Sequence, residues 1–214
     1  LSKSYPDFGQ ISFRKPDVHL SFKCSRCAEC CKNMKIRLTS LDIKNLCERL
    51  KVDTRKFHLR YTSIIIGKNK LPQYLLKTKP ECVFYENGCT VYESRPSSCR
   101  LYPFGTYHVF DKVYYFKVKN CIGFGKKKRI MINSFIKENQ VGNHLSFINK
   151  WELINNIELD KVKDKPRFVN LYKQLLFFFD SKFTKSFIKE NNLKSFSFED
   201  KILFFINYLL EYKN

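Results

Sequence analysis

Residues 24 to 31, with the sequence CSRCAECC, decide the fold of this chain. They place four thiols within eight residues, as Cys24, Cys27, Cys30 and Cys31. A two-residue spacer lets the backbone turn so that successive sulfurs face one point, which is the geometry of zinc knuckles and of ferredoxin-like loops. Ordinary core packing does not require such a density of thiols. The stretch therefore predicts a metal-chelating segment.

Four further cysteines follow at wider spacing, namely Cys82, Cys89, Cys99 and Cys121. With the first block they make eight predicted metal ligands, enough for two four-thiolate sites or for one multinuclear cluster. The ninth cysteine, Cys47, falls outside this pattern, within a stretch of helical character. We expect it to pack as a small apolar residue.

Both iron–sulfur clusters and zinc use thiolate ligands. Cys24, Cys27 and Cys30 reproduce the first three ligand spacings of a bacterial ferredoxin, although Cys31 and Lys32 then depart from that pattern. No histidine lies within the cysteine blocks, which removes the commonest mixed zinc ligand sets. The spacing and the softness of the ligands favour one or two 4Fe-4S clusters, with Zn²⁺ as the alternative.

Cationic side chains are expected near the ligands because four thiolates leave a net negative charge on either kind of centre. Arg95 and Arg100 flank Cys99 in the sequence and are the candidates. The competing interpretation is that they form surface ion pairs with Glu86 or Glu93. A disulfide framework is disfavoured, because the chain is longer than the small secreted domains that need one and shows no export signal.

Hydrophobic periodicity and turn residues predict an α+β fold. A small irregular metal-stabilised cysteine-rich module with short antiparallel strands is expected over residues 1–125, followed by a mainly helical region over 126–214 that packs on the module or extends it. The basic stretch 123–129, GFGKKKR, is expected to lead into a helix and either to bind an anion there or to form a solvated turn. The individual elements expected are strands at 34–38 and 73–77, helices from 41 to 50 and from 53–54 onward, a turn at 87–88, a hairpin over 106–119, and helices over 126–154, 171–179 and 198–210.

The charge balance is strongly positive. The chain carries 40 Lys plus Arg against 20 Asp plus Glu, a net charge of +20, which would attract RNA, DNA or an acidic protein. Compositional bias toward lysine is the competing explanation. No apolar run approaches the length of a membrane span, so a soluble, cytoplasmic protein is expected. Familiar nucleotide-binding and hydrolase motifs are absent from the sequence.

The cysteine blocks and their surroundings resemble the YkgJ-type CxxCxxCC cysteine-cluster family. The resemblance covers about half of the chain. It implies a zinc- or iron-chelating domain, often described as an iron–sulfur oxidoreductase. Flagellin lysine methylases look similar over the cysteine block, which implies methyl transfer to a protein substrate. The stretches that carry the resemblance are Phe22–Cys24, Ile36–Thr39 with Asp42, Cys82–Phe84, Cys89–Tyr92, Arg95–Phe104 and Cys121–Gly123.

Two functional hypotheses follow from the sequence. In the first, the chain is a cluster-bearing enzyme, redox-active or methyl-transferring, and its helical C-terminal half recognises a protein substrate. In the second, zinc stabilises a non-catalytic module whose basic surface docks on RNA, a ribosome or an acidic protein. The metal is the feature that separates the two hypotheses.

Overall fold

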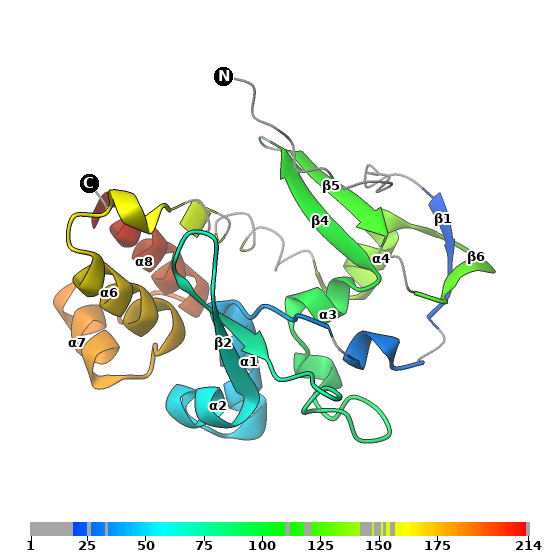
Figure 1. Ribbon diagram of the computed structural model, residues 1–214, viewed down its shortest axis with the longest axis horizontal. Coiled ribbons are helices and arrows are strands. Elements are labelled where there is room, and N and C mark those ends of the chain that lie inside the picture. The colour runs from blue at the N-terminus through cyan, green and yellow to red at the C-terminus, as the bar shows by residue number, and fades with distance from the viewer. Residues whose placement is uncertain are drawn as a thin grey trace.

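A computed structural model describes residues 19–24, 27–32, 34–109, 112–117, 121–141, 147, 151, 153–154 and 157–212. Within this part the fold is α+β, as predicted, and it contains seven α-helices and six strands (Figure 1). The helices are α1 Ser40–Leu50, α2 Thr54–Tyr61, α3 Ser97–Leu101, α4 Ile132–Glu138, α6 Lys165–Phe177, α7 Lys182–Glu190 and α8 Phe198–Tyr212. The strands are β1 His19–Phe22, β2 Thr62–Ile66, β3 Pro72–Leu76, β4 Phe104–Val109, β5 Lys112–Lys117 and β6 Phe124–Met131. Three 3-10 turns complete the description: η1 Glu29–Cys31, η2 Tyr92–Ser94 and η3 Leu159–Lys161.

The strands form three separate two-stranded antiparallel sheets, pairing β1 with β6, β2 with β3 and β4 with β5. The β4–β5 pair confirms the predicted hairpin, although residues 110 and 111 lie outside the described residues. The predicted strand at 73–77 is β3. The expected strand at 34–38 is an extended segment that hydrogen-bonds to β3, through Leu38 N–H to the Tyr74 carbonyl and Leu76 N–H to the Ile36 carbonyl, each at 2.9 Å.

Capping side chains start the first two helices where the sequence predicts them. Thr39 caps α1 by accepting the Asp42 N–H, while the Asp42 carboxylate accepts the Thr39 N–H, which together form a capping box. Lys51, with a left-handed φ of 55°, ends the helix. Asp53 caps α2 by accepting the Lys56 N–H.

The region from residue 126 begins differently from the prediction. Residues 124–131 form strand β6 rather than the start of a helix, and α4 begins only at Ile132. Pairing with β1, more than a hundred residues earlier in the chain, decides this, because Phe124 and Ile130 of β6 pack with Leu20 of β1 in one apolar cluster. Residues 124–129 of this stretch therefore lie in a strand, so the helix N-terminus that was expected to bind an anion does not form there.

The buried apolar residues form two clusters, and Figure 1 shows the elements that carry them side by side. The larger cluster joins α1, α2 and β3 to α6, α7 and α8. The smaller one joins β1, β4, β5 and β6 to α3 and α4. Residues from both sides of position 125 thus share the larger core. The division of the chain at 125 stays a prediction. None of the described helices has the length and apolarity to cross a membrane.

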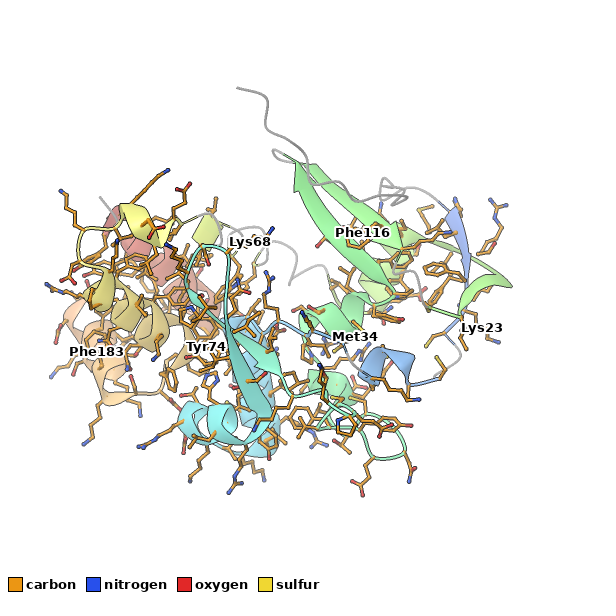
Figure 2. The ribbon with its side chains drawn as sticks, viewed as in Figure 1. Lys23, Met34, Lys68, Tyr74, Phe116 and Phe183 are labelled. Carbon is orange, nitrogen blue, oxygen red and sulfur yellow. The ribbon has the colours of Figure 1, made fainter. Side chains whose placement is uncertain are left out.

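His58 is buried among aromatic rings, of which Tyr74 is the nearest, at 4.3 Å between ring centroids. Figure 2 labels Tyr74. Its Nε2 lies 3.0 Å from the Phe177 carbonyl oxygen, so the neutral ring donates there. Burial lowers the pKa of His58 from 6.5 to about 4, against the smaller opposing effects of that hydrogen bond and of Asp180. His58 is therefore a core residue, and none of the eight predicted ligand cysteines contributes to its pKa shift.

The neutral, buried His58 makes stability depend on pH. Between pH 6.5 and about 4 the unfolded chain binds a proton at His58 and the folded chain does not. The free energy of unfolding therefore has its full value above pH 6.5 and decreases as the pH falls toward 4. The full effect is roughly 3 kcal/mol. We expect urea unfolding at pH 7 and pH 4.5 to show a smaller loss of stability in His58→Leu than in the parent. Equal losses in both proteins would contradict this assignment.

Candidate metal centre

The CxxCxxCC block folds into a tight turn at its end. Ala28 adopts a left-handed φ of 60°, and the Cys31 N–H donates to the Ala28 carbonyl at 2.7 Å. The last three residues form η1. The thiol of Cys31 donates a hydrogen bond to the sulfur of Cys30, so the two adjacent sulfurs lie close together. Both side chains are half-buried.

Cys82 and Cys89 lie within electrostatic reach both of Cys31 and of Cys99. We call this set the inner thiol group: Cys31, Cys82, Cys89 and Cys99. The Cys82 N–H donates to the Cys31 carbonyl at 2.7 Å, and Lys32 pairs with Glu81 as an isolated bridge, so two distant segments meet here. Cys82, Cys89 and Cys99 all pack against the larger core.

The loop from Cys82 to Cys89 returns on itself. Tyr85 pairs with Cys89, and the predicted turn at Asn87–Gly88 forms, with φ values of 53° and 150°. Gly88 suits this turn because its φ lies in the range that side chains avoid. The closed loop brings Cys89 back toward Cys82, which lies within electrostatic reach of it.

The remaining cysteines form a second set, which we call the outer thiol group: Cys24, Cys27, Cys30 and Cys121. Strands β1 and β6 bring its two halves together, because the Lys23 N–H donates to the Gly123 carbonyl at 3.0 Å. A Cβ on Gly123 would lie 2.6 Å from the Phe22 ring and 2.7 Å from the Lys23 oxygen, so only glycine allows this approach. This contact brings the segment that contains Cys24 close to the segment that contains Cys121. Lys23 marks this end of the molecule in Figure 2.

Tyr102 connects the two halves of the outer group. Its hydroxyl donates a hydrogen bond to Cys121, and burial, followed by that contact and the thiols of Cys30 and Cys27, raises the pKa of Tyr102. Cysteine spacing gave no signal for Tyr102, although it lies within the Arg95–Phe104 stretch that carries the family resemblance. Cys24 and Cys27 are exposed, so the outer group opens to solvent.

Burial, with a smaller contribution from repulsion between neighbouring thiols, raises the pKa of Cys30, Cys31, Cys82 and Cys99 and so favours their protonated form in the absence of a cation. Burial is the main cause that raises the pKa of Cys31 to about 12 and the pKa of Cys99 well above its ordinary value. Cys30, Cys82 and Cys89 add to the shift at Cys99. A bound cation reverses this preference, because it stabilises the thiolates that ligate it.

The inner and outer thiol groups are sets of cysteines that lie near one another, and neither is a complete coordination sphere. Within the described ranges, no three histidine, cysteine or carboxylate side chains lie close enough together to hold a metal ion. The donor chemistry nevertheless fits such an ion, since thiol sulfur is the preferred ligand both of structural zinc and of iron–sulfur clusters. The Phe84 N–H also donates a hydrogen bond to the Cys82 sulfur, a contact common around metal-bound thiolates.

Asp42 fixes the helix that carries Cys99. One carboxylate oxygen accepts the N–H and hydroxyl of Thr39, each at 2.9 Å, and the other accepts the N–H and hydroxyl of Ser97, each at 2.8 Å. Asp42 is only 1% exposed. It thereby joins the N-terminus of α1 to that of α3. The helix start near residue 41 was predicted from the sequence, whereas the contact of Asp42 with Ser97 was not, because the two residues are 55 positions apart.

Arg95 and Arg100 hold the turn before α3. Arg95 donates to the Tyr92 carbonyl at 2.8 Å and stacks on the Tyr92 ring, with 3.8 Å from guanidinium to centroid. The buried Arg100 donates to the carbonyls of Arg95 and Glu93. Neither forms an ion pair with Glu86 or Glu93 among the described side chains. Their predicted role as cations beside the metal stays a prediction.

Cys47 occupies the position expected of a packing residue. It is 7% exposed within the larger core, and burial raises the pKa of its thiol to about 12. Asp180, Asp53 and Glu48 add to this shift, and no other cysteine does. The separation of Cys47 from the other eight cysteines thus agrees with its spacing in the sequence.

Comparison with known families gives the class of protein that this thiol arrangement belongs to. The model of the CxxCxxCC family, whose description reads "Putative zinc- or iron-chelating domain", matches residues 23–129, half of the chain. No curated protein and no solved structure matches. The chain belongs to the CxxCxxCC family, and its matched region contains both thiol groups.

Proposed function

We propose that this chain is an iron–sulfur protein with two thiolate sites, one formed by the inner thiol group and the other by the outer. The observation that carries the proposal is the position of the vicinal pair, Cys30 and Cys31. Cys31 lies within electrostatic reach of Cys82 and Cys89. Cys30 lies within electrostatic reach of Cys24 and Cys27, and also of Cys82 and Cys99, so it lies between the two groups. Adjacent residues that face different partners can serve two centres, as ligands of a single run do in two-cluster ferredoxins.

The choice of iron–sulfur over zinc rests on the spacing of the cysteines and on the lack of a histidine in either group. Both groups contain thiols, and His58 is held in the aromatic core away from them. The ferredoxin-like spacing of Cys24, Cys27 and Cys30 adds to this preference. The hydrogen bond from Phe84 to Cys82 suits a cluster whose properties depend on N–H contacts to sulfur.

The two sites are suited to different roles. The inner group packs against the larger core, which suits a structural centre. The outer group has two exposed cysteines, so a substrate or redox partner can approach it. We assign the redox or methyl-transfer activity implied by the family resemblance to the outer group, with a protein as the substrate.

A zinc-stabilised docking module is the second candidate, and one observation favours it. The register between β1 and β6 shifts between Ser21 and Phe22, whose partners are Arg129 and Phe124. The intervening residues form a bulge whose Lys128 is exposed, next to the exposed Arg129. This basic bulge lies beside the outer group and could bind RNA or an acidic protein.

Metal analysis after anaerobic purification tests the proposal. Brown protein with iron and sulfide in equal amounts, at about eight of each per chain for two 4Fe-4S clusters, is the expected result. Colourless protein that contains zinc alone would favour the docking module instead. Protein with neither metal, after reconstitution has been attempted with each, would contradict both.

Removing the metal is expected to unfold part of the chain. The loops that carry the inner group contain only short 3-10 and α-helical turns, so metal binding contributes directly to their folding. After chelation, amide hydrogen exchange should accelerate over 81–103, while α6 and α8, which pack on each other, stay protected. Unchanged exchange over 81–103 in metal-free protein would refute this dependence.

A further inference from the structure

Strand β2 and the end of α2 expose an unusual amount of apolar surface. Leu59 is 71% exposed, Ile64 57%, Ile65 39% and Ile66 66%. All four lie within eight consecutive residues. Contiguous exposed apolar residues of this kind mark interaction sites more often than isolated ones do.

The outer edge of β2 is also available for strand pairing. Among the described residues β2 pairs only with β3, in a register that joins Ser63 to Leu75 and Ile65 to Gln73. Ladder hydrogen bonds occur at the odd-numbered positions, since the Tyr61 carbonyl accepts from Lys77 and the Gly67 N–H donates to Leu71. Alternation in an antiparallel ladder then directs the N–H and C=O groups of Ile64 and Ile66 outward.

Nothing within β2 protects this edge. Natural edge strands usually carry a lysine, a proline or a bulge that prevents pairing with another chain. Residues 62–66, TSIII, contain no charged residue and no proline, and the pairing with β3 is continuous. Their β-branched side chains favour an added strand.

The charged side chains near β2 indicate which kind of partner can pair with its outer edge. Arg60 and Lys68 are both exposed and lie at the two ends of β2, and Figure 2 shows Lys68 at the tip of the β2–β3 hairpin. In a two-fold pairing of β2 with a second copy centred on Ile64, Arg60 would face Lys68 of that copy. Like charges opposite each other oppose this pairing, and so does the net charge of +20 on each chain. An extended segment with acidic residues at its ends meets no such repulsion.

We propose that the outer edge of β2 binds an extended acidic segment of a partner protein by strand addition. Backbone hydrogen bonds to Ile64 and Ile66 provide the pairing, the apolar side chains of the segment cover the exposed isoleucines, and its acidic ends meet Arg60 and Lys68. This inference goes beyond the proposed metal function and does not depend on it.

A fluorescein-labelled peptide with the sequence Asp-Glu-Val-Thr-Val-Thr-Val-Glu-Asp is the probe, and fluorescence anisotropy with the full metal-loaded chain is the measurement. We expect binding that weakens by about fivefold or more when salt rises from 0.05 to 0.5 M. The same peptide with N-methyl groups on alternate residues along one edge, prepared for each of the two edges, should lose binding in one of these forms. Equal binding of the parent peptide and both methylated forms would overturn strand addition.

Two variants test the site on the protein itself. Ile64→Pro removes an outward N–H without removing a ladder hydrogen bond, and should weaken peptide binding at least about tenfold. Arg60→Glu combined with Lys68→Glu alters only exposed side chains and should do the same through charge. Phe196→Ser, at another exposed apolar residue, is the matched control and should bind the peptide normally.

The remaining outcomes also decide the question. Circular dichroism and metal content should match the parent in every variant, which separates loss of docking from loss of fold. Retained binding in both edge variants would overturn the proposal. So would concentration-dependent dimerisation that Ile64→Pro abolishes while the peptide fails to bind, because β2 would then pair with a second copy.

Discussion

Replacing Cys99 by serine is expected to remove the metal of the inner thiol group and to leave that of the outer group in place. Cys99 lies within electrostatic reach of Cys82 and Cys89, and Asp42 fixes the start of its helix. A serine hydroxyl is a poor substitute for a soft thiolate ligand. Metal analysis should therefore show loss of about half of the bound metal, with Cys27→Ser showing the complementary half.

The control for this experiment is Cys47→Ser, which changes a buried thiol outside both groups and should retain all of the metal. The vicinal pair gives the sharpest comparison, because Cys31→Ala should affect only the inner site and Cys30→Ala mainly the outer. Loss of all metal from both of these variants would indicate one coupled cluster. Retention of all metal by both would leave the pair without the role proposed for it.

Replacing Asp42 by asparagine is expected to destabilise the chain by roughly 2–4 kcal/mol and to weaken metal binding at the inner group. The buried carboxylate accepts four hydrogen bonds, two from Thr39 and two from Ser97. An asparagine side chain has one oxygen, so its amide nitrogen would face donors on one side and leave them without an acceptor. Loss of the hydrogen bonds to Ser97 would release the N-terminus of α3, the helix that carries Cys99.

Urea unfolding and metal competition on Asp42→Asn measure these two effects. Asp53→Asn is the matched control, because Asp53 caps α2 at the surface and asparagine caps equally well there, so little change is expected. An unfolding midpoint for Asp42→Asn equal to that of the parent would show that the α1–α3 connection contributes little. If Asp42→Asn is destabilised but binds metal at the inner group as tightly as the parent, Asp42 stabilises the fold and does not support metal binding.

Several structural features could be predicted from the sequence because they depend on interactions between residues close together in the chain. Thr39 with Asp42, and Asp53, are cap residues whose effect depends on neighbours three positions away, so the starts of α1 and α2 could be predicted. The Asn87–Gly88 turn and the β4–β5 hairpin are equally local. Periodicity indicated α6 and α8, because a helix buries one face at a fixed spacing.

Pairing between distant segments could not be read in the same way. The residues of β6 have spacing compatible with a helix, and only β1, far away in the chain, makes them a strand. Strand β2 was also missed, because its three adjacent isoleucines lack the alternation of a half-buried strand. The three isoleucines lack this alternation because both faces of β2 are largely exposed.

The sequence by itself determined that the chain belongs to a family of zinc- or iron-chelating domains. It also predicted eight of the nine cysteines as metal ligands and Cys47 as a packing residue, because ligand spacing is a property of the chain. Only the tertiary structure decided which cysteines are neighbours. The Cys31–Cys82 backbone contact and the approach of Lys23 to Gly123 join segments about 50 and 100 residues apart. Sequence spacing constrains where a short turn can place its thiols, whereas the meeting of remote segments depends on the core that buries them.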